Sequence, residues 1–210
     1  MINNSKKIEQ KSQFISFEGG EASGKSTQVL MLKNYLQKQK INVISTKEPG
    51  GTNLANSIRN LILSQEISDP LTESLIIAAA RRDHIKKIKQ HLKNEDYVIS
   101  DRYIDSFIVY QGIVKGLDEK IINKLIEWTT EGLKPNITIL LDIDVDNMMK
   151  RIKGSENHNT FYDNKNFDFH QKIRNGFLEI ASKSAERIKI VDGNKTKEEV
   201  HTDILSILNI

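Results

Sequence analysis

Eight consecutive residues near the N-terminus have the types and the spacing of a phosphate-binding loop. Residues 19–26 read GGEASGKS, which fits G-x-x-x-x-G-K-S, and they lie between an apolar run and a helical pattern. Glycines let successive backbone N–H groups turn toward phosphate oxygens, and the following helix adds the positive end of its dipole. The sequence therefore predicts a nucleotide site formed by Gly19, Gly20, Glu21, Ala22, Ser23, Gly24, Lys25, Ser26 and Thr27.

Four side chains in or after this loop suit phosphoryl transfer. We expect Lys25 on the β and γ phosphates of ATP, and Ser26 with Asp101 on Mg²⁺, the ion that neutralises charge on the leaving phosphates. Arg102 follows Asp101 directly and is a candidate clamp on a second phosphate, because a guanidinium binds phosphate with two parallel hydrogen bonds. A surface ion pair is the alternative interpretation of Asp101 and Arg102.

A nucleotide-dependent switch also carries such a loop, so the rest of the chain must separate the two classes. Guanine-binding switches usually have an N-K-x-D sequence after a later strand, and no such sequence follows Leu141 or Val191. Arg102, as an arginine for a second phosphate, favours an enzyme with two phosphorylated ligands.

The elements that must position these residues alternate between strands and helices. Apolar runs rich in β-branched residues predict strands, and stretches with helical spacing lie between them. This alternation predicts an α/β fold with a five-stranded parallel sheet, helices on both faces and ligands beyond the carboxyl ends of the strands. The five predicted strands are Phe14–Phe17, Ile41–Ser45, Tyr97–Ser100, Ile137–Leu141 and Arg187–Val191.

Length and composition fit one cytoplasmic domain. The chain has 210 residues, a formal net charge of +3 and no cysteine, which excludes disulfides, thiolate metal sites and cysteine nucleophiles. Residues 1–12 are polar and predict a flexible tail, so the single domain is expected over residues 13–210. Residues 154–166 have no apolar period and predict a mobile lid, with an ordinary loop as the alternative. No apolar stretch is long enough to span a membrane.

Several motifs together resemble the bacterial thymidylate kinase family. They occur in the family's order over nearly the whole chain, and the second and fourth are the most specific. They are FEGGEASGKSTQ at residues 17–28, TKEPGGT at 46–52, AARRDH at 79–84, SDRYIDSFIVYQG at 100–112 and FHQKIRNGFLEIA at 169–181.

This resemblance implies a nucleoside monophosphate kinase fold with a mobile lid, and transfer of a phosphoryl group from ATP to dTMP with Mg²⁺. It also implies a homodimer. By the family pattern, Glu21 organises the acceptor nucleotide and its sugar, and Arg81 reads the thymine carbonyl edge. Tyr110 and Gln111 line the base pocket, and Pro49 belongs to a turn that faces the acceptor. For Tyr110 the alternative is a core tyrosine with a satisfied hydroxyl.

Three positions depart from the family pattern. Lys47 replaces the usual arginine before Glu48 and keeps the charge without the planar fork that binds phosphate. Ile77 stands where the family usually has an aromatic ring against thymine. The lid segment has no arginine in residues 159–163, so we assign the lid cation to Arg151, with Lys153 and Lys165 as alternatives.

Two other functions remain open at this point. A kinase for another pyrimidine monophosphate such as dUMP is the nearer one, because apolar pockets discriminate weakly. A basic nucleic-acid-binding module is the other, suggested by the lysines that follow Arg81 and Arg82. Those lysines lie on a helical pattern beside Ile85, Ile88 and Leu92, so a solvated helix face explains them more simply, and we expect no nucleic-acid partner.

Overall fold

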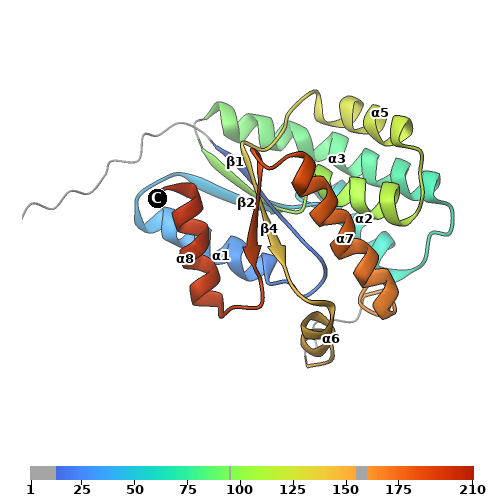
Figure 1. The fold of residues 1–210 in the computed structure, drawn as a ribbon. Coiled ribbons are helices and arrows are strands. Elements are labelled where there is room, and N and C mark those ends of the chain that lie inside the picture. Colours follow the sequence, from blue (N-terminus) through green and yellow to red (C-terminus); the bar gives the residue numbers. More distant parts are fainter. Residues whose placement is uncertain (1–12, 95, 155–159) are drawn as a thin grey trace, which may run out of the picture.

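The computed structural model describes residues 13–94, 96–154 and 160–210, so the predicted tail and residues 155–159 of the predicted lid lie outside the described residues. Five parallel strands form one sheet in the order β2-β3-β1-β4-β5. The predicted fold class is thereby confirmed (Figure 1). The strands are β1 (Phe14–Glu18), β2 (Val43–Lys47), β3 (Tyr97–Asp101), β4 (Ile137–Asp142) and β5 (Ile188–Asp192).

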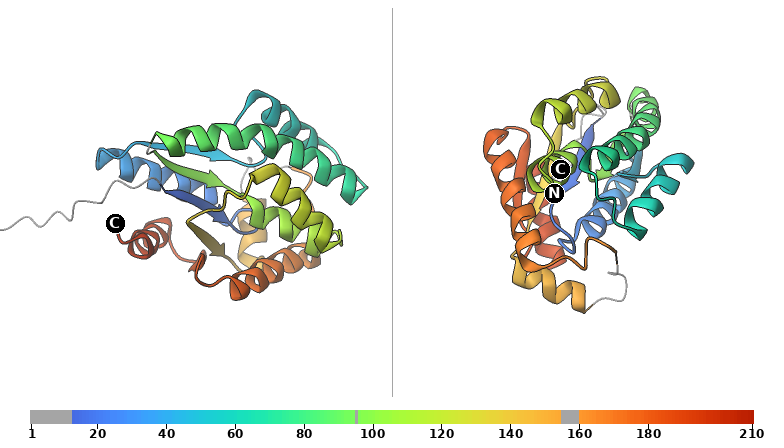
Figure 2. Two further views of the ribbon diagram at one scale, coloured as in Figure 1. Left: turned by 90° about the horizontal axis from the view of Figure 1, so that it is seen from above. Right: turned by 90° about the vertical axis from the view of Figure 1, so that its right-hand side faces the viewer.

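Helices cover both faces of this sheet, as Figures 1 and 2 show. On one face lie α1 (Lys25–Lys38) and α8 (Lys197–Leu208), which pack on every second strand residue, such as Ile15 and Phe17. The other face takes Phe14 and Leu140. It is covered by α3 (Pro70–Lys93), α4 (Ile104–Phe107), the π-helical segment η1 (Ile108–Val114), α5 (Glu119–Thr130) and α7 (Phe167–Lys183). The remaining helices are α2 (Asn53–Ser64), which packs on α3, and α6 (Val145–Lys153), which follows β4.

The second strand begins two residues later than predicted, at Val43. The apolar signal of Ile41 belongs to the end of α1, because its N–H donates to the Leu36 carbonyl at 3.0 Å. Lys40 has a φ of 61° and its N–H donates to the Gln37 carbonyl at 2.9 Å. These bonds form a Schellman motif with its apolar contact, which ends the helix and buries Ile41.

Side-chain caps fix where the helices around the site begin. Thr52 accepts from the Ala55 N–H at 3.1 Å at the start of α2, and Asp69 accepts from the Thr72 N–H at 2.7 Å at the start of α3. Helix α1 has no side-chain cap, so its first N–H groups stay available to an anion. In the described part of the chain, no helix is both long and apolar enough to cross a membrane.

Candidate active site

The carboxyl ends of the strands border one large pocket of about 800 Å³. It extends from the phosphate loop, through the end of β3, to a buried apolar end formed by α2, α3, η1 and residues 160–163. Most of the predicted site residues line this pocket, including Glu21–Thr27, Pro49, Ile77, Arg81, Asp101, Arg102, Tyr110, Gln111 and Arg151.

The phosphate loop connects β1 to α1 as predicted, and its conformation depends on glycine. Gly19 has a φ of +137°, and a Cβ there would lie 2.5 Å from the Leu141 carbonyl oxygen. No other residue fits that close approach of backbone to backbone. Gly19 and Gly20 lie behind the loop against Leu141, while residues 21–27 face the pocket.

Lys25 folds back over its own loop. Its ammonium donates to the carbonyls of Gly19 at 3.1 Å and Gly20 at 2.5 Å, and to the Ser23 hydroxyl at 3.2 Å. Burial, together with the nearby Arg102 charge, lowers the pKa of Lys25 to about 8. A phosphate in the pocket would offer this ammonium a better acceptor than three neutral oxygens.

Ser26 and Asp101 lie side by side beside the loop. The Ser26 hydroxyl donates to Asp101 Oδ2 at 2.6 Å, although the two residues are 75 positions apart. The described residues contain no group of three or more His, Cys, Asp or Glu side chains that could hold a metal ion. A hydroxyl and one carboxylate therefore fit an ion that takes its other ligands from phosphates and water, as Mg²⁺ does.

Arg102 lines the pocket in a backbone conformation unusual for a residue with a side chain, with a φ of 69°. Its guanidinium pairs with the Glu21 carboxylate and donates to the Gly19 carbonyl and the Ser106 hydroxyl, each at 3.0 Å. Burial opposes the charge of Glu21, but Arg102 and then Lys25 hold the pKa of Glu21 below its ordinary value. The structure thus brings the two predicted acceptor residues into one ion pair.

Tyr110 completes this group from η1. Its hydroxyl donates to Glu21 Oε1 at 2.8 Å, and its ring lies 5.1 Å from the Arg102 guanidinium carbon. Burial raises the pKa of Tyr110 well above its usual value, so the hydroxyl keeps its proton. The tyrosine is buried and hydrogen-bonded, as the core interpretation expected, and it also lines the pocket.

Arg81 is held by a buried carboxylate at the far end of the pocket. Its Nε donates to Glu48 Oε2 at 2.7 Å, and both side chains are nearly inaccessible to solvent. His84 contacts the other oxygen of Glu48 at 3.2 Å, and Thr46 contacts His84 Nε2 at 2.7 Å. Within the described residues, Nη1 of Arg81 is buried without a hydrogen-bond partner. A buried donor without a partner is costly, which makes this atom a candidate contact for a ligand.

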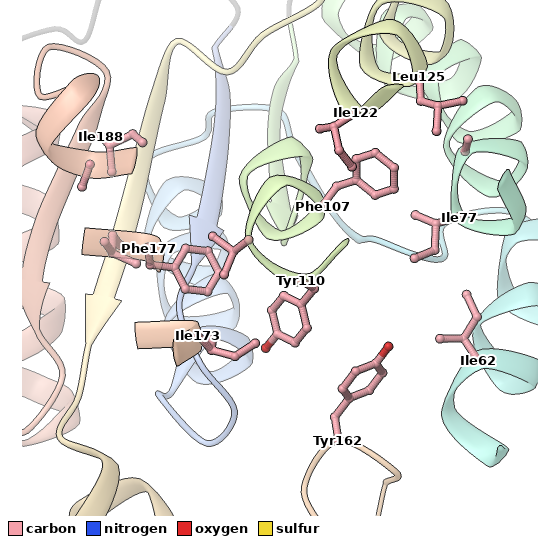
Figure 3. Packing of buried hydrophobic residues seen from close by; sticks show 14 residues of the cluster. Ile62, Ile77, Phe107, Tyr110, Ile122, Leu125, Tyr162, Ile173, Phe177 and Ile188 are labelled. Atoms are coloured by element: carbon pink, nitrogen blue, oxygen red, sulfur yellow. The ribbon is translucent and has the colours of Figure 1, made fainter. Parts of the chain in front are cut away.

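The apolar end of the pocket contains residues that the sequence analysis missed. In Figure 3 the side chains of Ile62, Ile77, Tyr110 and Tyr162 border the same space. The Tyr162 ring lies 5.6 Å from that of Tyr110 at an interplanar angle of 84°. Tyr162 comes from the predicted lid, whose described part forms turns with Tyr162 buried. The only available signal was the pair of adjacent aromatic residues Phe161 and Tyr162, and the polar residues around the pair obscured it.

A cation beside the acceptor turn, Arg59 of α2, lines the pocket where Lys47 was expected. Lys47 is exposed at the end of β2 and is not among the residues that line the pocket. Arg59 lines it instead and donates to the Pro49 carbonyl at 3.2 Å. Sequence reasoning missed Arg59 because a single arginine on a helix gives no signal without the fold that turns it inward.

Arg151 reaches the phosphate loop from the end of α6. Its guanidinium donates to the Ala22 carbonyl at 3.3 Å and to the Gly193 carbonyl at 2.9 Å. Of the two alternatives, Lys153 is exposed on α6, and Lys165 pairs with Glu66 and lies 3.8 Å from the centre of the Phe161 ring. Arg151 alone among these three lines the pocket.

Known proteins resemble this chain in sequence and in architecture. The family model described as thymidylate kinase matches residues 17–204. The thymidylate kinase of Marinomonas sp. (strain MWYL1) is 42% identical over 195 residues, which cover 91% of this chain and 92% of the relative. That of Sulfurihydrogenibium sp. (strain YO3AOP1) is 40% identical over 198 residues, covering 93% and 96%.

A solved structure agrees with these relatives. The crystal structure of thymidylate kinase from Ehrlichia chaffeensis superposes with a TM-score of 0.76 at 35% identity, covering 94% of this chain and 98% of that one. Sequence and fold therefore point the same way as the pocket, and the chain belongs to the thymidylate kinase family of phosphotransferases.

Proposed function

We propose that the chain transfers the γ-phosphoryl group of ATP to dTMP, giving ADP and dTDP. One observation carries this proposal beyond family membership: a single pocket joins a phosphate loop to a buried end with an unpaired arginine donor. Two nucleotides bound from opposite ends would bring their phosphates together near Arg102. An oxygen of the dTMP phosphate then attacks the γ phosphorus, and the bond from that phosphorus to the β-phosphate oxygen breaks.

At the donor end, Lys25 and the phosphate loop would bind the β and γ phosphates. Mg²⁺ would be held by Ser26 and Asp101, whose oxygens lie 2.6 Å apart, and it would neutralise charge on the transferring phosphates. No strong general base is needed, since the acceptor oxygen is already anionic. Catalysis then consists mostly of positioning and charge neutralisation.

At the acceptor end, Arg102 would clamp the dTMP phosphate after exchanging Glu21 for it. Arg59 lies in the same part of the pocket, where the burial of its side chain and the Arg102 charge lower its pKa. Glu21 and Tyr110 would then face the deoxyribose. The unpaired Nη1 of Arg81 would donate to a thymine carbonyl, with Ile77 against the base.

Arg151 would meet the transferred phosphoryl group from the donor side. Its present partners are two backbone carbonyls, which an anionic oxygen can replace. Residues 154–166 would form the lid that excludes water, which otherwise accepts the phosphoryl group.

Exposed leucines on two neighbouring helices support a homodimer. Leu54 and Leu61 of α2 are 55% and 41% exposed, and Leu71 and Leu75 of α3 are 39% and 51% exposed. Exposed apolar side chains on helices that pack on each other favour a protein contact. Light scattering coupled to gel filtration would give the mass in solution.

We place the enzyme in the cytoplasm because its proposed substrates are free nucleotides.

A coupled ADP-release assay across monophosphates tests the proposed reaction. We expect the highest kcat/KM for dTMP, with dUMP weaker and dCMP weakest. Faster turnover of dUMP would favour the kinase for another pyrimidine nucleotide. DNA binding that persists at high salt in a protein without kinase activity would favour the nucleic-acid module.

A further inference from the structure

A buried carboxylate lies directly behind the base end of the pocket. Glu73, in the first turns of α3, is 2% exposed and accepts hydrogen bonds from three side chains. The Tyr162 hydroxyl donates to Oε1, and the Lys115 ammonium donates to Oε2. The third donor is Nε2 of Gln111, at 3.2 Å from Oε2. Glu73 itself does not line the pocket, but Gln111 and Tyr162 do.

The carboxylate determines which way the Gln111 amide points. An amide has a donor end and an acceptor end, whereas an ionised carboxylate can only accept. Gln111 must therefore turn its NH₂ group toward Glu73, which leaves its carbonyl oxygen for the pocket. The side chain is only 3% exposed, so water cannot freely satisfy the opposite orientation.

The resulting polar groups match one kind of pyrimidine. Arg81 offers an unpaired donor and Gln111 an acceptor, both toward the same end of the pocket. Thymine and uracil present a carbonyl acceptor beside an N–H donor on this edge, and cytosine presents an amino donor beside a nitrogen acceptor. The apolar neighbours Ile62 and Ile77 cannot read that difference.

We propose that Glu73 is a positioning residue that selects thymine and uracil nucleotides against cytosine nucleotides by fixing the Gln111 amide. This inference rests on the proposed function, because it requires the base of a nucleoside monophosphate at this end of the pocket. A site that leaves a buried hydrogen-bonding group unpaired rejects the wrong ligand far more strongly than an apolar pocket does.

The test compares kcat/KM for dTMP and dCMP in two variants of one residue. Glu73→Met removes the acceptor, so the Gln111 amide can turn and the dTMP/dCMP ratio should fall at least about tenfold. Glu73→Gln should keep the ratio close to that of the wild type. Lys115 can only donate, so the new amide oxygen stays at the position of Oε2, and the Tyr162 hydroxyl can accept from the new NH₂.

A matched control removes a different bond to the same carboxylate. Tyr162→Phe loses its hydrogen bond to Glu73 but leaves the Gln111 contact, so the dTMP/dCMP ratio should not move. The dTMP/dUMP ratio should stay constant in every variant, since uracil presents the same edge as thymine. A merely structural Glu73 would lower turnover of all three substrates together.

A second variant covers the case in which Glu73→Met does not fold. The double change Glu73→Gln with Lys115→Met removes both charges, so no unpaired ion is left in the interior. Without Lys115 the new amide can turn its NH₂ toward Gln111, and the dTMP/dCMP ratio should again fall. An unchanged ratio in either folded variant overturns the inference.

The inference and the proposed function fail in different ways. If the wild type turns over no pyrimidine monophosphate, the proposed function is wrong. The inference is then decided by calorimetric dissociation constants for dTMP and dCMP, and equal constants overturn it. If the wild type prefers dTMP and Glu73→Met keeps that preference, the inference alone is wrong.

Discussion

The two ends of the pocket are built in different ways. The phosphate end comes from consecutive residues, 19–26, and most of its contacts to an anion would come from backbone N–H groups and one lysine. The base end is assembled from side chains of α2, α3, η1 and residues 160–163. A local motif thus forms one end, and tertiary packing forms the other.

The two ends also differ in how their charges are held before a ligand arrives. Lys25 and Arg102 are satisfied by protein groups that a phosphate would have to replace. At the base end, Glu48 holds Arg81 through Nε, and Nη1 has no hydrogen-bond partner in the part of the chain that the structure describes. Buried ion pairs contribute little net stability but define geometry. The phosphate end must therefore exchange partners on binding, whereas the base end is already arranged.

The largest expected effect comes from a substitution at the phosphate end of the pocket. Lys25→Ala should lower kcat by about 10³-fold, because the ammonium stabilises charge that develops on the transferring phosphates. The fold should survive, since the hydrogen bonds of the Lys25 ammonium within the described residues all go to its own loop. Lys38→Ala, at the exposed end of the same helix, is the matched control and should leave kcat unchanged. Near-normal turnover in folded Lys25→Ala would remove the phosphate loop from the mechanism.

Arg151→Ala should come next, with kcat and kcat/KM both about 10²-fold lower and ATP affinity nearly unchanged. This pattern is expected for a group that acts only in the transition state. Lys153→Ala on the same helix is the control. If Lys153→Ala or Lys165→Ala lost activity while Arg151→Ala did not, the catalytic role would pass to that lysine. Loss of thermal stability with normal turnover would make Arg151 structural.

Arg102→Lys should affect the binding of the acceptor nucleotide more than the binding of ATP. The change keeps a charge but loses the planar fork, so kcat/KM for dTMP should fall about tenfold while KM for ATP changes little. Steady-state kinetics with each substrate varied in turn would measure this. Identical kinetics for dTMP would mean that Arg102 serves only its ion pair with Glu21.

The smallest expected effect concerns the base end. Ile77→Phe adds a ring beside the space bordered by Tyr110 and Tyr162, and stacking on thymine should lower KM for dTMP by about threefold. KM for ATP is the internal control and should stay constant. A higher KM for dTMP would show that the Ile77 position has no room for a ring. The wild-type side chains would then already pack directly against the thymine base.

This contrast explains how much could be predicted from the sequence. The strands and the phosphate loop follow from local patterns, and all lie close to where they were expected. The β2 boundary was wrong because the apolar Ile41 completes a helix end instead of a strand. Arg59, Tyr162 and Glu73 gave no usable signal, since each enters the site only when distant elements pack together. Lys47 shows the converse, because a residue inside a motif can still lie outside the lining of the pocket.

Gly51 has no side chain, yet it affects the position of Arg81 through two other residues. A Cβ at this residue would lie 2.2 Å from Nε2 of His84, whose ring contacts Glu48, which in turn holds Arg81. Any larger residue must move the histidine and loosen the carboxylate that fixes the arginine. In a random mutagenesis screen, Gly51 should therefore behave like a substrate-contact position and be intolerant of every replacement. The set of positions that determine substrate recognition is larger than the set that touches the substrate.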